Sequence, residues 1–103
     1  MDCIFCKIIK NEIPSFQVYQ DDHCLAFLDI APTTPGHILL VPKNHVASLV
    51  ELDDLALGYL MAAVKKVAEA TIKALAAKGY NLLVNNGSAA GQIIDHFHFH
   101  IIP

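Results

Sequence analysis

The chain has few basic side chains. Lysine and arginine together number seven among 103 residues, against ten aspartates and glutamates, which gives a formal net charge of −3. A protein that binds the nucleic-acid backbone normally carries a cluster or stripe of Lys and Arg. The composition therefore argues against a nucleic-acid partner.

A long apolar run and a secretory leader are also missing. Charged residues interrupt the most apolar helical stretch at Asp53, Asp54, Lys65, Lys66 and Glu69, so no run reaches the length of a membrane span. The start, Met-Asp-Cys, lacks the basic, apolar and small-residue order of a signal peptide. The chain has three cysteines. An odd number cannot all pair in disulfides within one chain, which fits a reducing compartment. We expect a cytoplasmic protein without a membrane partner.

No linker, low-complexity segment or internal repeat divides the chain, and its length corresponds to a single domain over residues 1–103. Hydrophobic residues make up 54% of it, a high share for a small soluble chain. A domain of this size buries only a modest core. We therefore expect the remaining apolar surface to lie in a subunit interface, which predicts a homodimer.

One long helix is predicted over residues 53–78, with Asp53 and Asp54 near its start and Gly79 after its end. Its first apolar face has spacings of three and four residues: Leu60, Val64, Val67, Thr71 and Leu75. Its second face consists mostly of small residues: Tyr59, Ala63, Ala70, Ala74 and Ala77. One face is expected to contact a sheet, and the other is available to a partner.

Five strands are predicted from short segments bounded by turn residues: 16–20, 24–29, 37–41, 80–85 and 95–102. Residues 3–10 predict a short N-terminal helix or turn, and residues 46–49 predict one helical turn. Five strands and one long helix, joined by local hairpins, predict an α+β domain with an antiparallel sheet.

Residues 96–102 alternate histidine with aromatic or aliphatic side chains. This is the period of a strand, so His96, His98 and His100 are expected on one face, and the apolar residues between them on the other. Imidazole titrates near neutral pH, can act as a nucleophile and can ligate zinc. A strand face with three of the chain's six histidines is therefore a candidate site.

The residues alone leave three interpretations of this face. The histidines can be solvated, they can be three ligands of a catalytic zinc ion, or one can act as a nucleophile while its neighbours orient or bind. The loop before them, residues 85–92, is rich in asparagine and glycine, and such loops can bind an anion through their backbone. That loop disfavours the solvated face.

The motif His-φ-His-φ-His-φ-φ, with φ apolar, resembles the signature of the histidine triad (HIT) superfamily of nucleotide hydrolases and transferases. Residues 25–30, 35–45 and 85–103 also resemble that family, and the opening Cys-Ile-Phe-Cys resembles prokaryotic members of its Hint branch. The resemblance implies the HIT fold, a five-stranded antiparallel sheet with one long helix, and a dimer with a continuous sheet.

The resemblance also implies site residues and a reaction. His98 corresponds to the nucleophile, which attacks the α-phosphate of a purine nucleotide and forms a nucleotidyl-histidine. His100 and Gln92 correspond to two further catalytic positions: the first contacts phosphate and assists proton transfer, and the second binds phosphate near the leaving-group oxygen. Asn85 and Gly91 correspond to positions of the phosphate-binding loop. The residues that correspond to the nucleoside pocket are Phe27, Asp29 and Ile30. The implied substrates are nucleoside phosphoramidates, derivatives of AMP or GMP, and dinucleoside polyphosphates are an alternative.

Cys3 and Cys6 have the spacing of two zinc ligands, but spacing alone also allows a redox pair or two unpaired cysteines. In zinc-bearing HIT relatives the other two ligands correspond to His45 and His96 of this chain. Four ligands fill a tetrahedral shell, so the resemblance implies a structural Zn²⁺ rather than a catalytic one.

Two features depart from the family pattern. Some Hint relatives carry a hydroxyl residue directly after the glutamine, where this chain has Ile93. An apolar residue there favours an alternative function, a nucleotide-binding interaction module with weak or no catalysis. Family members also usually continue past the triad, so we expect the C-terminal segment to be absent from the sequence that ends at Pro103.

Overall fold

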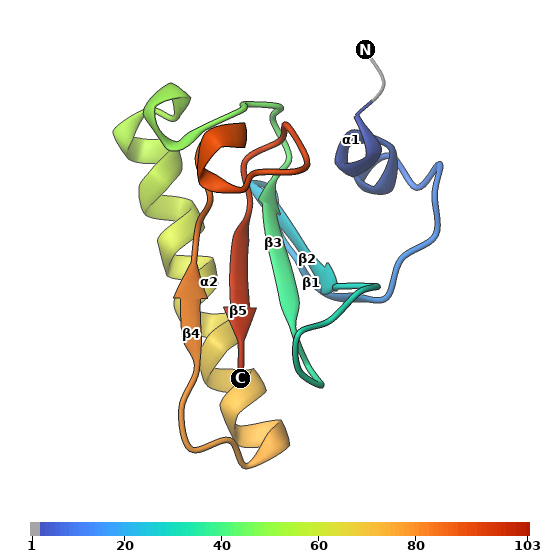
Figure 1. Cartoon of the computed structure of the whole chain (residues 1–103), viewed down its shortest axis with the longest axis vertical. Coiled ribbons are helices and arrows are strands. Elements are labelled where there is room, and N and C mark those ends of the chain that lie inside the picture. Colours follow the sequence, from blue (N-terminus) through green and yellow to red (C-terminus); the bar gives the residue numbers. More distant parts are fainter. Residues whose placement is uncertain (1–2) are drawn as a thin grey trace.

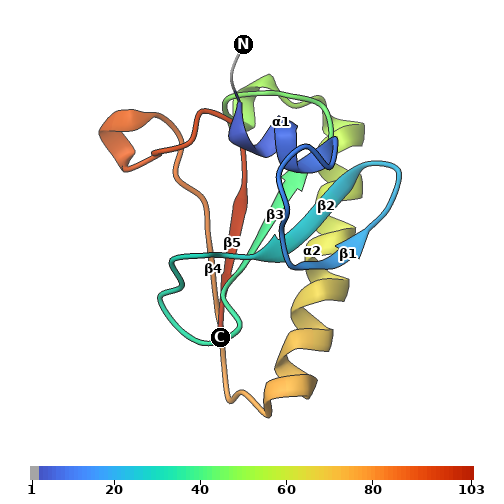
Figure 2. The same ribbon diagram turned by 90° about the vertical axis from the view of Figure 1, so that its right-hand side faces the viewer.

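The computed structural model describes residues 3–103 as one antiparallel sheet with helices on both sides (Figures 1 and 2). The helical elements are α1 (Ile4–Ile9), η1 (Leu49–Glu51), α2 (Asp54–Leu75) and η2 (Ser88–Ala90). The strands are β1 (Gln17–Gln20), β2 (Cys24–Leu28), β3 (Ile38–Pro42), β4 (Asn81–Leu83) and β5 (Phe99–Ile102), and they lie in the order β1-β2-β3-β5-β4. All four pairings are antiparallel, which confirms the predicted α+β fold.

Strand β3, at the centre of the sheet, and its neighbour β2 are buried on both faces, except for half-buried Leu28 at the end of β2. Successive side chains of a strand point to opposite faces, so Ala26 and Leu40 pack in a core that includes α2, whereas Phe27 and Leu39 pack in a second core that includes α1. The sheet is thus covered by the long helix on one side and by the short helix on the other.

The alternation predicted for the C-terminal segment is confirmed. Phe97, Phe99 and Ile101 are buried in the core that contains α2. The rings of His96 and His98 contact Phe5 of α1, which belongs to the other core. The apolar side chains therefore direct the histidines toward the α1 side of the sheet.

Regular strand pairing begins later in this segment than predicted. β5 starts at Phe99, opposite Leu40 of β3, not at residue 95. The backbone of Phe97 instead donates to the carbonyl of Val46 at 2.7 Å. His96 and His98 therefore precede the sheet ladder, and the chain bends at His96.

Helix α2 starts as predicted and ends early. Asp53 is its N-cap and accepts from the Ala56 amide at 2.7 Å. The helix ends at Leu75 because Ala76 adopts a left-handed conformation, φ 50°, and the Ala77 amide donates to the carbonyl of Ile72 at 3.0 Å. These bonds satisfy the last carbonyls, so the prediction that the helix continues to residue 78, with Gly79 after it, is wrong.

The smaller elements follow the predictions with shifted boundaries. A hairpin joins β1 to β2, and Asp21 stabilises it by accepting from the amides of His23 and Cys24. The helical turn predicted over residues 46–49 is found as η1, three residues further along. Among the helices of residues 3–103, none combines the length and apolar character needed to cross a membrane.

Candidate functional site

A cavity of about 440 Å³ lies between α1 and the histidine face, and this volume is within the range of ligand pockets. Its apolar walls include Ile4, Phe5 and Ile8 of α1. It is lined by seven of the eight residues expected to bind nucleotide: Phe27, Asp29, Ile30, Asn85, Gly91, His98 and His100. The structure thus brings together residues from four separate parts of the chain.

His98 is buried, with 7% of its surface exposed. Its Nδ1 lies 2.7 Å from the carbonyl oxygen of His96. A carbonyl only accepts, so Nδ1 carries the hydrogen and Nε2 keeps a free lone pair. Burial lowers the pKa of His98, which favours the neutral ring. The arrangement leaves one imidazole nitrogen unprotonated, as a nucleophile requires.

His100 has the opposite placement of its hydrogen, and His37 fixes it. The amide of Thr33 donates to Nδ1 of His37 at 3.1 Å, so Nε2 of His37 carries the hydrogen. That nitrogen lies 3.0 Å from Nδ1 of His100 and donates to it. Burial first, and then the neighbouring His98 and His37, lower the pKa of His100. Neutral His100 therefore carries its hydrogen on Nε2, as a donor.

Sequence reasoning assigned no chemistry to His37, yet it is 4% exposed and belongs to this hydrogen-bonded chain. It also lies near Asp29, with 3.6 Å between its Nε2 and the carboxylate. His37 and His100 are 63 positions apart and meet because β3 pairs with β5. No local motif in the sequence marks such a contact.

Gln92 is the one predicted nucleotide-binding residue outside the cavity lining. Its Oε1 accepts from the Gly87 amide at 2.7 Å, and its Nε2 donates to the carbonyls of Ala47 at 2.8 Å and Ile94 at 2.9 Å. The side chain thereby joins three backbone segments and supports the loop over residues 85–92. In this conformation its amide is used by the protein itself.

The loop that Gln92 supports has two more fixed points. Gly91 has φ 92°, a conformation that favours glycine because it has no Cβ. Asn85 donates to the carbonyl of Gly91 at 3.5 Å. Beside them, Ile93 lines the cavity and is 91% exposed, and Ile30 on the rim is 90% exposed. The rim of the cavity is therefore partly apolar.

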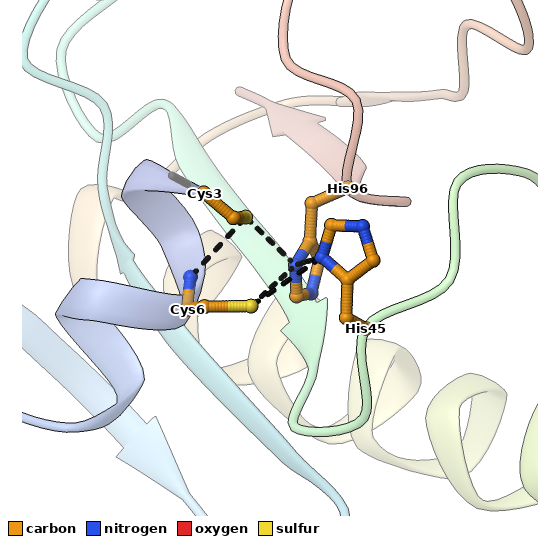
Figure 3. Close-up of side chains that lie close together, drawn as sticks. All are labelled: Cys3, Cys6, His45 and His96. Atoms are coloured by element: carbon orange, nitrogen blue, oxygen red, sulfur yellow. Dashed lines mark hydrogen bonds between the residues drawn. The ribbon is translucent and has the colours of Figure 1, made fainter. Parts of the chain in front are cut away.

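Four side chains of the types that can ligate a metal meet at the N-terminal end of α1 (Figure 3): Cys3, Cys6, His45 and His96. The two histidines approach through Nδ1, 3.1 Å apart. The sulfur of Cys3 lies 3.3 Å from Nδ1 of His96, and that of Cys6 lies 3.3 Å from Nδ1 of His45. Figure 3 shows the four donor atoms pointing at a common centre.

This donor set fits zinc in number, type and spacing. Zinc bonds of about 2.3 Å to sulfur and about 2.05 Å to nitrogen, arranged as a tetrahedron, separate two nitrogens by about 3.3 Å and sulfur from nitrogen by about 3.6 Å. Nε2 of buried His96 donates to the Pro42 carbonyl at 2.8 Å, so its Nδ1 has a free lone pair. Burial lowers the pKa of His96, and the neutral ring is the form that binds metals.

Residues 10–103 match the family model of the HIT domain. The chain belongs to the HIT family.

The HIT domain of this chain resembles proteins from several kingdoms. It is 50% identical over 103 residues to adenosine 5'-monophosphoramidase hnt1 of Schizosaccharomyces pombe, covering 100% of this chain and 74% of that protein. It is 46% identical over 102 residues to adenylylsulfatase HINT3 of Arabidopsis thaliana, covering 99% of this chain and 52% of the relative. A crystal structure of a HIT family member from Bacillus subtilis superposes with a TM-score of 0.97 at 48% identity, over 100% of this chain and 73% of that one.

The hydrogen positions in this HIT site can be tested directly. We expect ¹⁵N-histidine NMR at mildly alkaline pH to show His98 with its hydrogen on Nδ1 and His100 with its hydrogen on Nε2, because their partners are a carbonyl and a donating His37. Exposed His23 serves as the internal control and should show mixed tautomers. The same tautomer at both residues would contradict the hydrogen-bond assignment.

Proposed function

We propose that this HIT protein is a hydrolase or transferase that acts at the α-phosphate of purine nucleotides, with nucleoside phosphoramidates as its substrate class. The observation that carries the proposal is the free Nε2 of neutral His98 in a cavity of nucleoside size, beside the donor His100. Relatives named adenosine 5'-monophosphoramidase and adenylylsulfatase are consistent with this chemistry.

The cavity offers a separate surface to each part of a nucleotide. Phe27 and Ile30, with the apolar residues of α1, provide a slot for a flat base. One oxygen of Asp29 accepts from the Ala31 amide, and the other, which lies 3.6 Å from Nε2 of His37, has a lone pair left for a ribose hydroxyl. Asn85 and Gly91 line the end near the histidines, where the phosphate would lie.

In the first step, Nε2 of His98 attacks the α-phosphorus and the phosphorus–nitrogen bond breaks. The new nucleotidyl-imidazolium keeps its Nδ1 hydrogen, which the His96 carbonyl already accepts. The Nε2 hydrogen of His100 is placed to offset the charge that develops on the phosphoryl group or leaving nitrogen. The ring centroids of His98 and His100 are 4.8 Å apart, so both can reach one phosphate.

In the second step, water attacks phosphorus and the bond to Nε2 breaks, which releases a nucleoside monophosphate and restores neutral His98. In the first step the leaving amine takes up one proton from solvent, and in the second step the attacking water returns one to solvent, so the two steps balance. Ile93 supplies no hydroxyl, so His100 and Asn85 are the polar side chains that line the phosphate end of the cavity beside His98.

We expect His98→Ala to lower turnover of an adenosine phosphoramidate by about two orders of magnitude or more, because it removes the nucleophile. The variant should still bind AMP, since the other cavity walls remain. Steady-state kinetics and calorimetry measure the two effects, with His23→Ala as a control that removes an exposed histidine. Retention of more than a tenth of the rate would refute the assignment, and AMP binding without turnover by wild type would favour the interaction module.

We also propose that Cys3, Cys6, His45 and His96 hold one structural Zn²⁺. The fit of their donor atoms to a tetrahedral shell supports this, and four protein ligands leave no open position for substrate. A reducing, cytoplasmic compartment would keep Cys3 and Cys6 available as thiolate ligands rather than as a disulfide. No nucleic acid or membrane is expected among the partners.

Purified protein should contain about one zinc per chain by elemental analysis. Chelation should lower the melting temperature, because a metal that binds the folded state adds its binding free energy to folding. Cys6→Ser should show the same loss, whereas Cys24→Ala should keep the metal. Metal-free protein after expression with ample zinc would contradict the site, and strong activation by added divalent ions would indicate a metal-dependent hydrolase instead.

A homodimer is the third proposal, formed through β4 and the outer face of α2. Strand β4 is a sheet edge on which Leu82 and Leu83 are more than 40% exposed, and Tyr59 and Met61 of α2 are exposed as well. An exposed apolar edge strand is a template for pairing with another copy.

Light scattering at micromolar concentration should give twice the chain mass. Leu83→Lys should shift the protein toward the monomer, because a charge on the edge opposes pairing. Val50→Lys, at a residue that is 90% exposed in η1, is the matched control and should remain dimeric. A monomeric wild type would overturn this proposal.

A further inference from the structure

Phe5 links the metal-ligand cluster to the cavity. It lies between Cys3 and Cys6 in the sequence and is 5% exposed. Its ring makes edge contacts with His98, with centroids 5.1 Å apart at 86°, and with His96, 5.8 Å apart at 73°. A third edge contact joins it to Phe27, 5.5 Å apart at 69°. One side chain thus touches a ligand residue, the nucleophile and a wall of the nucleoside slot.

His96 links the cluster to the cavity a second time, through its side chain and its backbone carbonyl. Its side chain directs Nδ1 toward the cysteine sulfurs and Nε2 toward the Pro42 carbonyl. Its backbone carbonyl accepts from Nδ1 of His98. A shift of His96 would therefore disturb the hydrogen bond that keeps the lone pair of His98 on Nε2.

Helix α1 depends on these contacts for its position. It has six residues, far fewer than an isolated helix needs for stability in water. Phe5 and Ile8 anchor it in the core, and the cluster ties its N-terminal end to His45 and His96. Without an ion, that end is held only by weak thiol–imidazole contacts of 3.3 Å and by the packing of Phe5 and Ile8, so a bound metal would hold it more firmly.

We propose that metal binding and nucleotide binding are energetically coupled in this protein, with Phe5 and the His96 carbonyl as the positioning groups between them. The inference rests on the zinc and nucleotide sites proposed above. An ion in the cluster fixes α1, and α1 forms one wall of the slot and packs against the nucleophile. Coupling between two ligands is reciprocal. If bound metal raises the affinity for the nucleotide by some factor, bound nucleotide must raise the affinity for the metal by the same factor.

The test measures both sides of this relation with Zn²⁺ and AMP as probes. Calorimetry gives the AMP affinity of zinc-loaded and metal-stripped protein, and competition with a chromophoric chelator gives the zinc affinity with and without saturating AMP. Both affinities should change by the same factor, about tenfold, which is typical of coupled sites. Stripping should also replace the single His98 tautomer with a mixture in ¹⁵N NMR.

Phe5→Leu keeps the test decisive even if stripped protein unfolds. This variant retains all four ligands and should bind one zinc, yet AMP should now change its zinc affinity less than threefold. Cys24→Ala, a buried thiol outside the cluster and the cavity, should keep the full effect. If the wild type binds zinc equally well with and without AMP, the coupling is overturned. The proposed hydrolase function would still stand, because turnover is measured separately. Full coupling in Phe5→Leu would overturn the role of Phe5, and failure of wild type to bind AMP would overturn the proposed function as well.

Discussion

The burial of three apolar side chains at the end of the chain determines where the chemistry lies. Phe97, Phe99 and Ile101 pack against α2 with almost no exposure, and full burial of each such side chain contributes about 1.5–3 kcal/mol. A slip of one residue would place imidazoles in that core and leave the apolar side chains in the cavity. The same packing that stabilises the sheet therefore holds the histidines toward α1.

Two apolar patterns, alternation in strands and a spacing of three or four residues in the helix, made much of this architecture predictable. The alternation from residue 96 onward identified both the buried face and the histidine face, and the apolar spacing after Asp53 identified α2. The ligand set of Cys3, Cys6, His45 and His96 followed from resemblance, and the structure brings these residues together. Metal occupancy and catalytic roles remain predictions.

What could not be predicted depends on contacts between distant segments. His37 meets His100 only through the pairing of β3 with β5. Gln92 bonds to Gly87 and to the Ala47 carbonyl, 45 positions away, and so serves the loop rather than the cavity lining. The early end of α2 is set by backbone hydrogen bonds at Ala76 and Ala77, where no glycine marks the stop.

The three cysteines lie in two very different environments. Cys24 is fully buried in β2, and burial, assisted by nearby Asp21, raises the pKa of its thiol to about 12. Alkylating reagents react with thiolates that they can reach, so Cys24 is inert to them in the folded protein. Any thiol that a maleimide or iodoacetamide titrates under native conditions belongs to the pair on α1. Thiol labelling of the unmodified chain therefore measures the accessibility of Cys3 and Cys6 alone, without first replacing Cys24.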